Sequence, residues 1–259
     1  MFRRILIPTD FSTASEWVFD DAVRIAGRSG AEVVIVHVRM TRTSNPGELR
    51  FPADSTLYEY AEQQELDRLR DRVRRANASI STRLIVRQAP DPGAEICATA
   101  TAENADLIVI ATHARHHVAH LFVGSTTHSV LDTPPCPVLA IRYGIRKREA
   151  MRRLLVPVHL EQTSRAALDL AARTGEEIHL LVVCDEDDTT RAEQLLQSLA
   201  ADIPNAKTTV LQGTHAEEEI IRYAGVVDAD AIFLNANHHP GSRKLDIVRH
   251  ATVPVMIVP

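Results

Sequence analysis

Cysteine is scarce in this chain of 259 residues, which has three cysteines, Cys97, Cys136 and Cys184. They are scattered, with no Cys-x-x-Cys pair and no even set that would indicate a disulfide framework. Reduced thiols in a cytosolic protein are the simplest interpretation.

Long hydrophobic runs are also missing. Arg3 and Arg4 precede an apolar stretch that covers only Ile5–Ile7 before Pro8 interrupts it, and this is too short for the core of a signal peptide. No run approaches the roughly 18 apolar residues that a membrane-spanning helix needs. We therefore expect a soluble, cytoplasmic protein without a membrane partner.

A strong excess of charge of one sign is absent too, since the formal net charge is −5 and the isoelectric point is near 6.2. This balance gives no general reason to expect nucleic acid as a partner. The stretch 142–153 does carry six basic residues, but a solvated linker explains it better than a nucleic-acid patch.

What the chain does contain is a repeat. Residues 3–12 return at 152–161, with Pro8 matched by Pro157 at an offset of 149 positions. The offset falls to 124 at Glu95/Glu219 and to 117 at Gly124/Gly241, so the second copy lacks 25 residues in its middle and 7 in a later loop. A period this long indicates duplicated domains. We predict an N-terminal domain at 1–143, a linker at 144–151 and a C-terminal domain at 152–259.

Short β-branched runs alternate with segments of helical period in both copies, which indicates a parallel sheet covered by helices. Because the apolar residues in most of these runs are continuous and do not alternate with polar ones, the strands should be buried on both faces. The runs in the first copy are Ile5–Ile7, Val33–Val38, Arg83–Val86, Leu107–Ala111 and Val138–Ile141, and those in the second are Leu154–Val156, Ile178–Val183, Thr208–Leu211, Ala231–Leu234 and Val255–Val258.

Three places in the first copy should converge, because open parallel sheets bind ligands at the carboxyl ends of their strands. These places are Pro8-Thr9-Asp10, His37-Val38, and Ala111–Ala114 together with Gly124-Ser125. A Gly-Ser pair that opens a helix offers amides and the positive dipole end to a phosphate, and Asp10 suits a ribose or a base. The alternative is that both positions only cap helices.

The whole chain resembles a tandem universal stress protein. The resemblance rests on Ile5–Ser12, Ala105–Val109, Thr112-His113, Gly124-Ser125 and Pro135–Leu139. It implies two flavodoxin-like or Rossmann-like α/β domains, akin to adenine nucleotide alpha hydrolases, each with a five-stranded parallel sheet in the order 3-2-1-4-5. It also implies an intrachain pseudo-dimer of the two domains, and we expect a homodimer of chains. The apolar fifth strands, Val138–Ile141 and Val255–Val258, would be edges that need covering.

The resemblance further implies a pocket for ATP or another adenine nucleotide, with or without Mg²⁺. The family's signature is Gly, two residues, Gly, nine residues, Gly, then Ser or Thr, and alanine replaces the first two glycines here. A left-handed backbone at an alanine costs ~1–2 kcal/mol, so weakened binding is expected. Ala111 should be tolerable at a strand end, whereas Ala114, in the middle of the turn, is the more damaging change. The implied pocket residues are Pro8, Thr9, Asp10, Val38, Ile110, Ala111, His113, Ala114, Gly124, Ser125, Thr126 and Thr127.

The second copy is the poorer candidate for a nucleotide site. His159 replaces Asp10, and five residues separate Asn235 from Gly241 where the first copy has twelve. His159, His238 and His239 could together bind zinc, although no acidic or cysteine ligand accompanies them and exposed loop histidines are common.

The resulting prediction is a cytoplasmic, non-enzymatic stress-response protein with a regulatory nucleotide in its N-terminal domain. A slow ATPase is one alternative, against which the motif lacks a Walker lysine, paired magnesium carboxylates and a catalytic arginine. A nucleotide-free interaction scaffold is the other.

Overall fold

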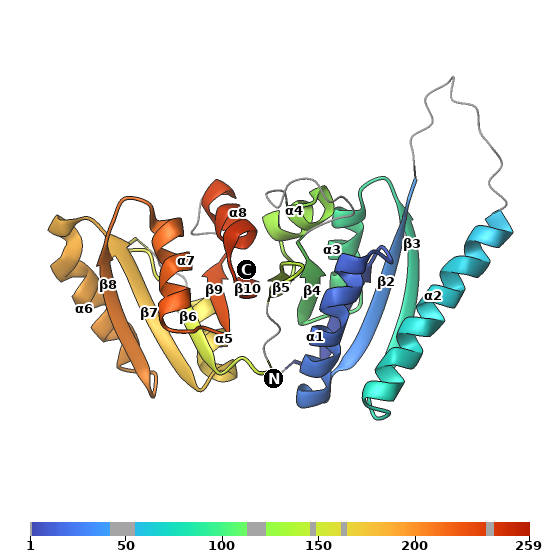
Figure 1. The fold of residues 1–259 in the computed structure, drawn as a ribbon, viewed down its shortest axis with the longest axis horizontal. Coiled ribbons are helices and arrows are strands. Elements are labelled where there is room, and N and C mark those ends of the chain that lie inside the picture. Colours follow the sequence, from blue (N-terminus) through green and yellow to red (C-terminus); the bar gives the residue numbers. More distant parts are fainter. Residues whose placement is uncertain (1, 42–54, 113–122, 146–148, 162–164, 237–240) are drawn as a thin grey trace, which may run out of the picture.

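A single ten-stranded sheet runs through the molecule, with helices on both faces (Figure 1). The computed structural model describes residues 2–41, 55–112, 123–145, 149–161, 165–236 and 241–259. The strand order is β3-β2-β1-β4-β5-β10-β9-β6-β7-β8. Each half thus has the predicted order 3-2-1-4-5, with all of its own strand pairs parallel.

The element bounds follow the predicted alternation of strands and helices. The N-terminal half contains β1 (Arg4–Thr9), α1 (Thr13–Ser29), β2 (Glu32–Met40), α2 (Ser55–Ala76), β3 (Thr82–Ala89), α3 (Pro92–Ala102), β4 (Leu107–Ala111), α4 (Ser125–Asp132) and β5 (Val138–Ile141). The C-terminal half contains β6 (Arg153–Pro157), α5 (Ala166–Thr174), β7 (Glu177–Cys184), the short 3₁₀ helix η1 (Glu186–Asp188), α6 (Thr189–Ala200), β8 (Ala206–Gln212), α7 (Ala216–Val226), β9 (Ala231–Asn235), α8 (Gly241–His250) and β10 (Val255–Val258).

Two hydrophobic cores sandwich the sheet, which explains the continuous apolar runs. Ile5 and Ile7 of β1 belong to the core under α1, α2, α5 and α6, whereas Leu6 faces the core under α3, α4, α7 and α8. Successive strand residues point to opposite faces, so in the inner strands both sets must be apolar. The outer strands β3 and β8 are only partly buried, because no further strand covers their edges. Within the described residues, no helix combines the length and the apolar character that crossing a membrane requires.

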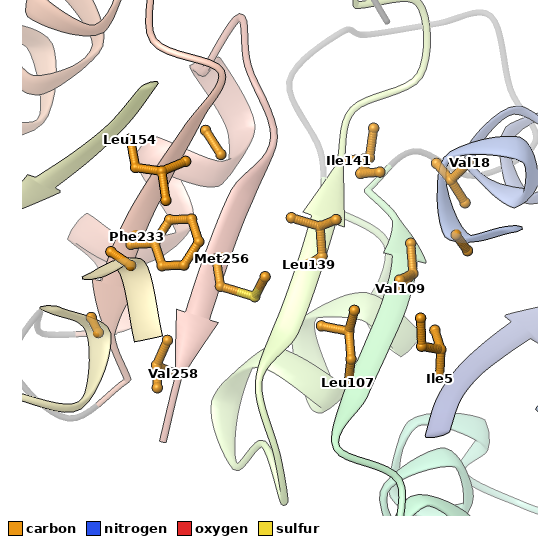
Figure 2. Close-up of a cluster of buried hydrophobic side chains, with 14 of the residues drawn as sticks. Ile5, Val18, Leu107, Val109, Leu139, Ile141, Leu154, Phe233, Met256 and Val258 are labelled. Atoms are coloured by element: carbon orange, nitrogen blue, oxygen red, sulfur yellow. The ribbon is translucent and has the colours of Figure 1, made fainter. Parts of the chain in front are cut away.

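The two halves join through their fifth strands. β5 and β10 pair antiparallel, with Leu139 opposite Met256, and both side chains are fully buried. Figure 2 shows these two residues at the centre of a cluster that Val109 extends on one side and Phe233 on the other. The expected intrachain pseudo-dimer is therefore one continuous sheet, in which each apolar fifth strand covers the edge of the other.

Candidate functional site

A cleft of about 860 Å³ opens at the carboxyl ends of the strands in the N-terminal half. This volume is within the usual range for small-molecule sites. Ten of the twelve residues implied by the sequence line it, while His113 and Ala114 lie outside the described residues. The ten are Pro8, Thr9, Asp10, Val38, Ile110, Ala111, Gly124, Ser125, Thr126 and Thr127.

A tight turn after β1 places Asp10 at the cleft. The Thr9 hydroxyl accepts a hydrogen bond from the Phe11 amide at 3.0 Å, and Asp10 Oδ1 accepts one from the Ser12 amide, also at 3.0 Å. Phe11 has a φ of 59°, which is the left-handed region and is uncommon for a residue that is not glycine. Such strained backbone persists where the surrounding structure enforces it, as at ligand sites.

The second strand continues past the end of the first. β1 pairs with β2 only as far as Thr9, opposite His37, whereas β2 continues with β3 to Met40. The Glu32 amide bonds toward β1 and the Val33 amide toward β3, and this alternation continues along a parallel strand. The carbonyl of Val38 and the amide of Met40 therefore point to the side where β1 has ended, which is the cleft.

Helix α4 forms the opposite end of the cleft. Its N-cap, Gly124, has no side chain to satisfy the first amides, so those of Ser125, Thr126 and Thr127 stand at the positive end of the helix dipole. The Thr127 hydroxyl donates to the Ala111 carbonyl at 2.8 Å and so ties this helix end to β4.

Ala111 is tolerated at the end of its strand, as its position in the sequence predicted, and it does not carry the backbone cost of a left-handed alanine. It ends β4 as a strand residue and is not among the described residues with positive φ. The penalty for a left-handed alanine therefore does not arise at this position, and Ala114 lies outside the described residues.

Sequence reasoning missed an ion-pair cluster in the cleft wall. Glu62 of α2 is buried and accepts two hydrogen bonds from Arg39, at 2.6 Å from Nε and 2.9 Å from Nη2. These hydrogen bonds raise the pKa of Arg39. His37 lies between this pair and β1, with Nδ1 donating to the Thr9 carbonyl at 2.8 Å and Nε2 at 3.7 Å from Glu62. The charge of Arg39 is thus compensated within the wall.

The position of α4 depends on a close approach to α3 at Gly93. A methyl group there would be closer to the Ser129 Cβ than van der Waals contact allows, and 2.9 Å from the Thr126 carbonyl oxygen. We expect Gly93→Ala to lower the free energy of unfolding by about 1–3 kcal/mol, because overpacking displaces one helix. Urea denaturation measures this change in the free energy of unfolding.

Gly225→Ala on α7 is the matched control, because a methyl group at Gly225 meets no atom within 4 Å. At position 225, alanine should stabilise the helix by about 0.5–1 kcal/mol relative to glycine. Equal effects of the two substitutions would contradict the close α3–α4 packing.

The counterpart of the cleft in the C-terminal half is nearly filled. Among the described residues it measures about 30 Å³, which is room for one or two water molecules. His159 and Arg243 line it at the positions of Asp10 and Thr126. Buried Asn235, at the position of Ala111, accepts a hydrogen bond from the Ala167 amide at 2.8 Å and so caps α5.

The zinc hypothesis for the second half falls largely outside the described residues, because His238 and His239 are not among them. The His159 Nδ1 accepts a hydrogen bond from the Glu161 amide at 3.2 Å. In the part of the chain that the structure describes, no group of three or more His, Cys, Asp or Glu side chains could hold a metal ion.

Comparison with known proteins identifies the family to which this chain is similar. The profile described as the Universal stress protein family matches residues 1–142. A Staphylococcus aureus protein that bears the universal stress protein name is 30% identical over 143 residues, which are 54% of this chain and 84% of that protein.

Two solved structures extend the likeness in fold to the whole chain. A universal stress protein from Archaeoglobus fulgidus has a TM-score of 0.76 at 22% identity, with 98% of this chain and 95% of that chain covered. A functionally unknown protein from Pseudomonas aeruginosa has a TM-score of 0.68 at 15% identity, with 99% and 92% covered. Because the family profile spans more than half of its length, this chain belongs to the universal stress protein family.

Proposed function

We propose that the N-terminal half binds ATP or another adenine nucleotide in this cleft, as the regulatory ligand of a stress-response protein. The observation that carries the proposal is the arrangement of the cleft's two ends. Helix α4 presents uncapped amides at one end, and β2 presents backbone groups beyond the last β1 pair at the other.

The phosphates fit the α4 end. Amides of the first helical turn and the positive end of the dipole bind anions without a cationic side chain. This matters here because Arg39, which also lines the cleft, is already hydrogen-bonded to Glu62. The Ser125 and Thr126 side chains add hydroxyl groups beside these amides.

The adenine fits the β2 end. Its amino group can donate to the Val38 carbonyl, and the adjacent ring nitrogen can accept from the Met40 amide. Guanine has an oxygen in place of that amino group, which would face the carbonyl lone pairs, so the cleft should prefer ATP to GTP. Asp10, between the two ends, can accept hydrogen bonds from ribose hydroxyls.

We further propose that this site binds its nucleotide without turning it over. No lysine lines the cleft within the described residues, and phosphoryl transfer depends on cations that stabilise the transferring group. Mg²⁺ would reach such a site mainly through the nucleotide's own phosphates. A cytoplasmic location, a homodimer of chains and a structural role for the C-terminal half remain part of the proposal.

Substitution of Asp10 tests the proposal. Asp10→Asn keeps an oxygen that can accept from the Ser12 amide but loses the charge, and we expect affinity for ATP to fall about tenfold. Affinity for inorganic triphosphate should stay unchanged, because that ligand has no ribose. Isothermal titration calorimetry measures both affinities.

Glu65→Gln is the matched control, because Glu65 of α2 lines the same cleft and the substitution removes the same charge. It should leave the affinity for ATP within about twofold of the parent value, since a partly exposed charge contributes little. Equal losses in the two variants, or a parallel loss of triphosphate binding in Asp10→Asn, would refute the assigned role of Asp10.

A further inference from the structure

A buried lysine of the C-terminal half contacts the helix that forms the phosphate end of the cleft. Lys244 of α8 is only 3% exposed, and its Nζ donates to the Leu131 carbonyl of α4 at 2.8 Å. A second, longer contact joins Nζ to the Ala236 carbonyl at 3.4 Å. Burial lowers the pKa of Lys244, and the nearby carboxylate of Asp132 opposes this effect.

The repeat shows that this contact is peculiar to the second copy. Lys244 occupies the position that Thr127 has in the first copy, counted from Gly241 and Gly124. The Thr127 hydroxyl donates to Ala111 within its own half. Lys244 instead reaches a residue 113 positions away in the other half, and Figure 1 shows α4 and α8 facing each other above β5 and β10.

The contact provides a hydrogen-bond donor for a carbonyl at the C-terminal end of α4. Leu131 is the second-last residue of this helix, and the last carbonyls of a helix have no partner within it. An ammonium group at that end also interacts favourably with the negative end of the helix dipole. Because α4 has eight residues and is only ~12 Å long, its position at one end fixes its position at the other.

We propose that Lys244 is a positioning residue for the cleft, through which the C-terminal half holds α4 and couples to a phosphate-bearing ligand at the N-terminus of that helix. This inference rests on the proposed function and concerns the regulation of the nucleotide site. A movement of α8 would change the affinity of that site for the nucleotide. Coupling between sites is reciprocal, so a bound nucleotide must also stabilise α8.

The contact between Lys244 and α4 is testable without any nucleotide. In Lys244→Met, the amides at the end of α4, from His128 to Leu131, should exchange with deuterium about tenfold faster than in the parent chain, because a hydrogen bond to a charged group is lost. The amides of α1 should not change. Lys207→Met on β8 is the control, because that lysine is largely exposed and pairs with Glu177 within the C-terminal half. Unchanged exchange in α4 would overturn the proposal.

The coupling is testable with two ligands. Lys244→Met should weaken ATP binding about fivefold, at the lower end of usual coupling strengths, and leave adenosine binding unchanged because adenosine has no phosphate. Equal losses for both ligands would indicate general damage and overturn the positioning role. If the parent chain binds no ATP, the proposed function fails and the coupling with it, while the exchange experiment still decides whether Lys244 holds α4.

A measurement on the unmodified chain does not depend on how the variant folds. Saturating ATP should slow amide exchange in α8, around Ile247 and Val248, as well as in α4. Protection confined to the N-terminal half would overturn the coupling.

Discussion

Replacing Leu139 by aspartate is expected to cost more than about 5 kcal/mol of unfolding free energy and to leave little folded protein. Leu139 is fully buried at the joint between the halves, opposite Met256 of β10. A carboxylate there would have to lose its hydration or force β5 and β10 apart, and burying an unpaired charge is among the most destabilising changes known. Because a typical domain has only ~5–15 kcal/mol of stability, urea denaturation followed by circular dichroism should show little or no native baseline.

The matched control is Leu139→Met, which preserves volume and apolarity and should cost less than about 1.5 kcal/mol. Size-exclusion chromatography of any soluble Leu139→Asp protein would reveal an expanded chain. A variant of native size and near-parental stability would contradict the account of the two halves as one continuous structure.

Replacing Thr126 by glutamate is expected to weaken ATP binding by at least about 100-fold, or ~2.7 kcal/mol. Thr126 lines the cleft in the first turn of α4, where the phosphates are proposed to lie. Two unit charges of the same sign 4 Å apart repel by ~4 kcal/mol at an effective dielectric constant of 20. The carboxylate would also occupy the positive end of the helix dipole itself.

Thr126→Gln is the control, because it has nearly the same size without the charge, and it should cost less than about tenfold. Adenosine should bind both variants alike. An affinity for ATP that is insensitive to the charge at position 126 would place the phosphates elsewhere. Calorimetric titration of both variants with ATP and adenosine distinguishes these outcomes.

The fold could be predicted well from the sequence because its signals are local and repeated. Continuous apolar runs marked the buried strands, and the two copies of the opening motif around Pro8 and Pro157 marked the duplication. The antiparallel joint between β5 and β10 left no such signal. The runs Val138–Ile141 and Val255–Val258 showed only that two apolar edges needed a partner, and the structure shows that each is the partner of the other.

The cleft was predictable in part for the same reason. Residues at strand ends and at the start of α4 could be placed together from topology alone. The Arg39–Glu62 pair could not be, because it depends on how α2 docks against β2. The contact of Lys244 could not be predicted either, since it depends on a carbonyl in the other half.

The two halves have diverged at matched positions. The first keeps a cleft of about 860 Å³, whereas its described counterpart measures about 30 Å³ and has Arg243 at the position of Thr126. Among the described residues, the counterpart in the second half is too small for a nucleotide, and this difference supports the proposal of a single site in the first half. We therefore propose that each chain of two domains binds one nucleotide.

Calorimetric titration of the full chain with ATP tests this central claim most directly, because it reports the affinity and the number of sites together. We predict saturable binding at one site per chain, with ATP preferred to GTP. Two equivalent sites per chain, or no heat of binding at millimolar ATP, would contradict it.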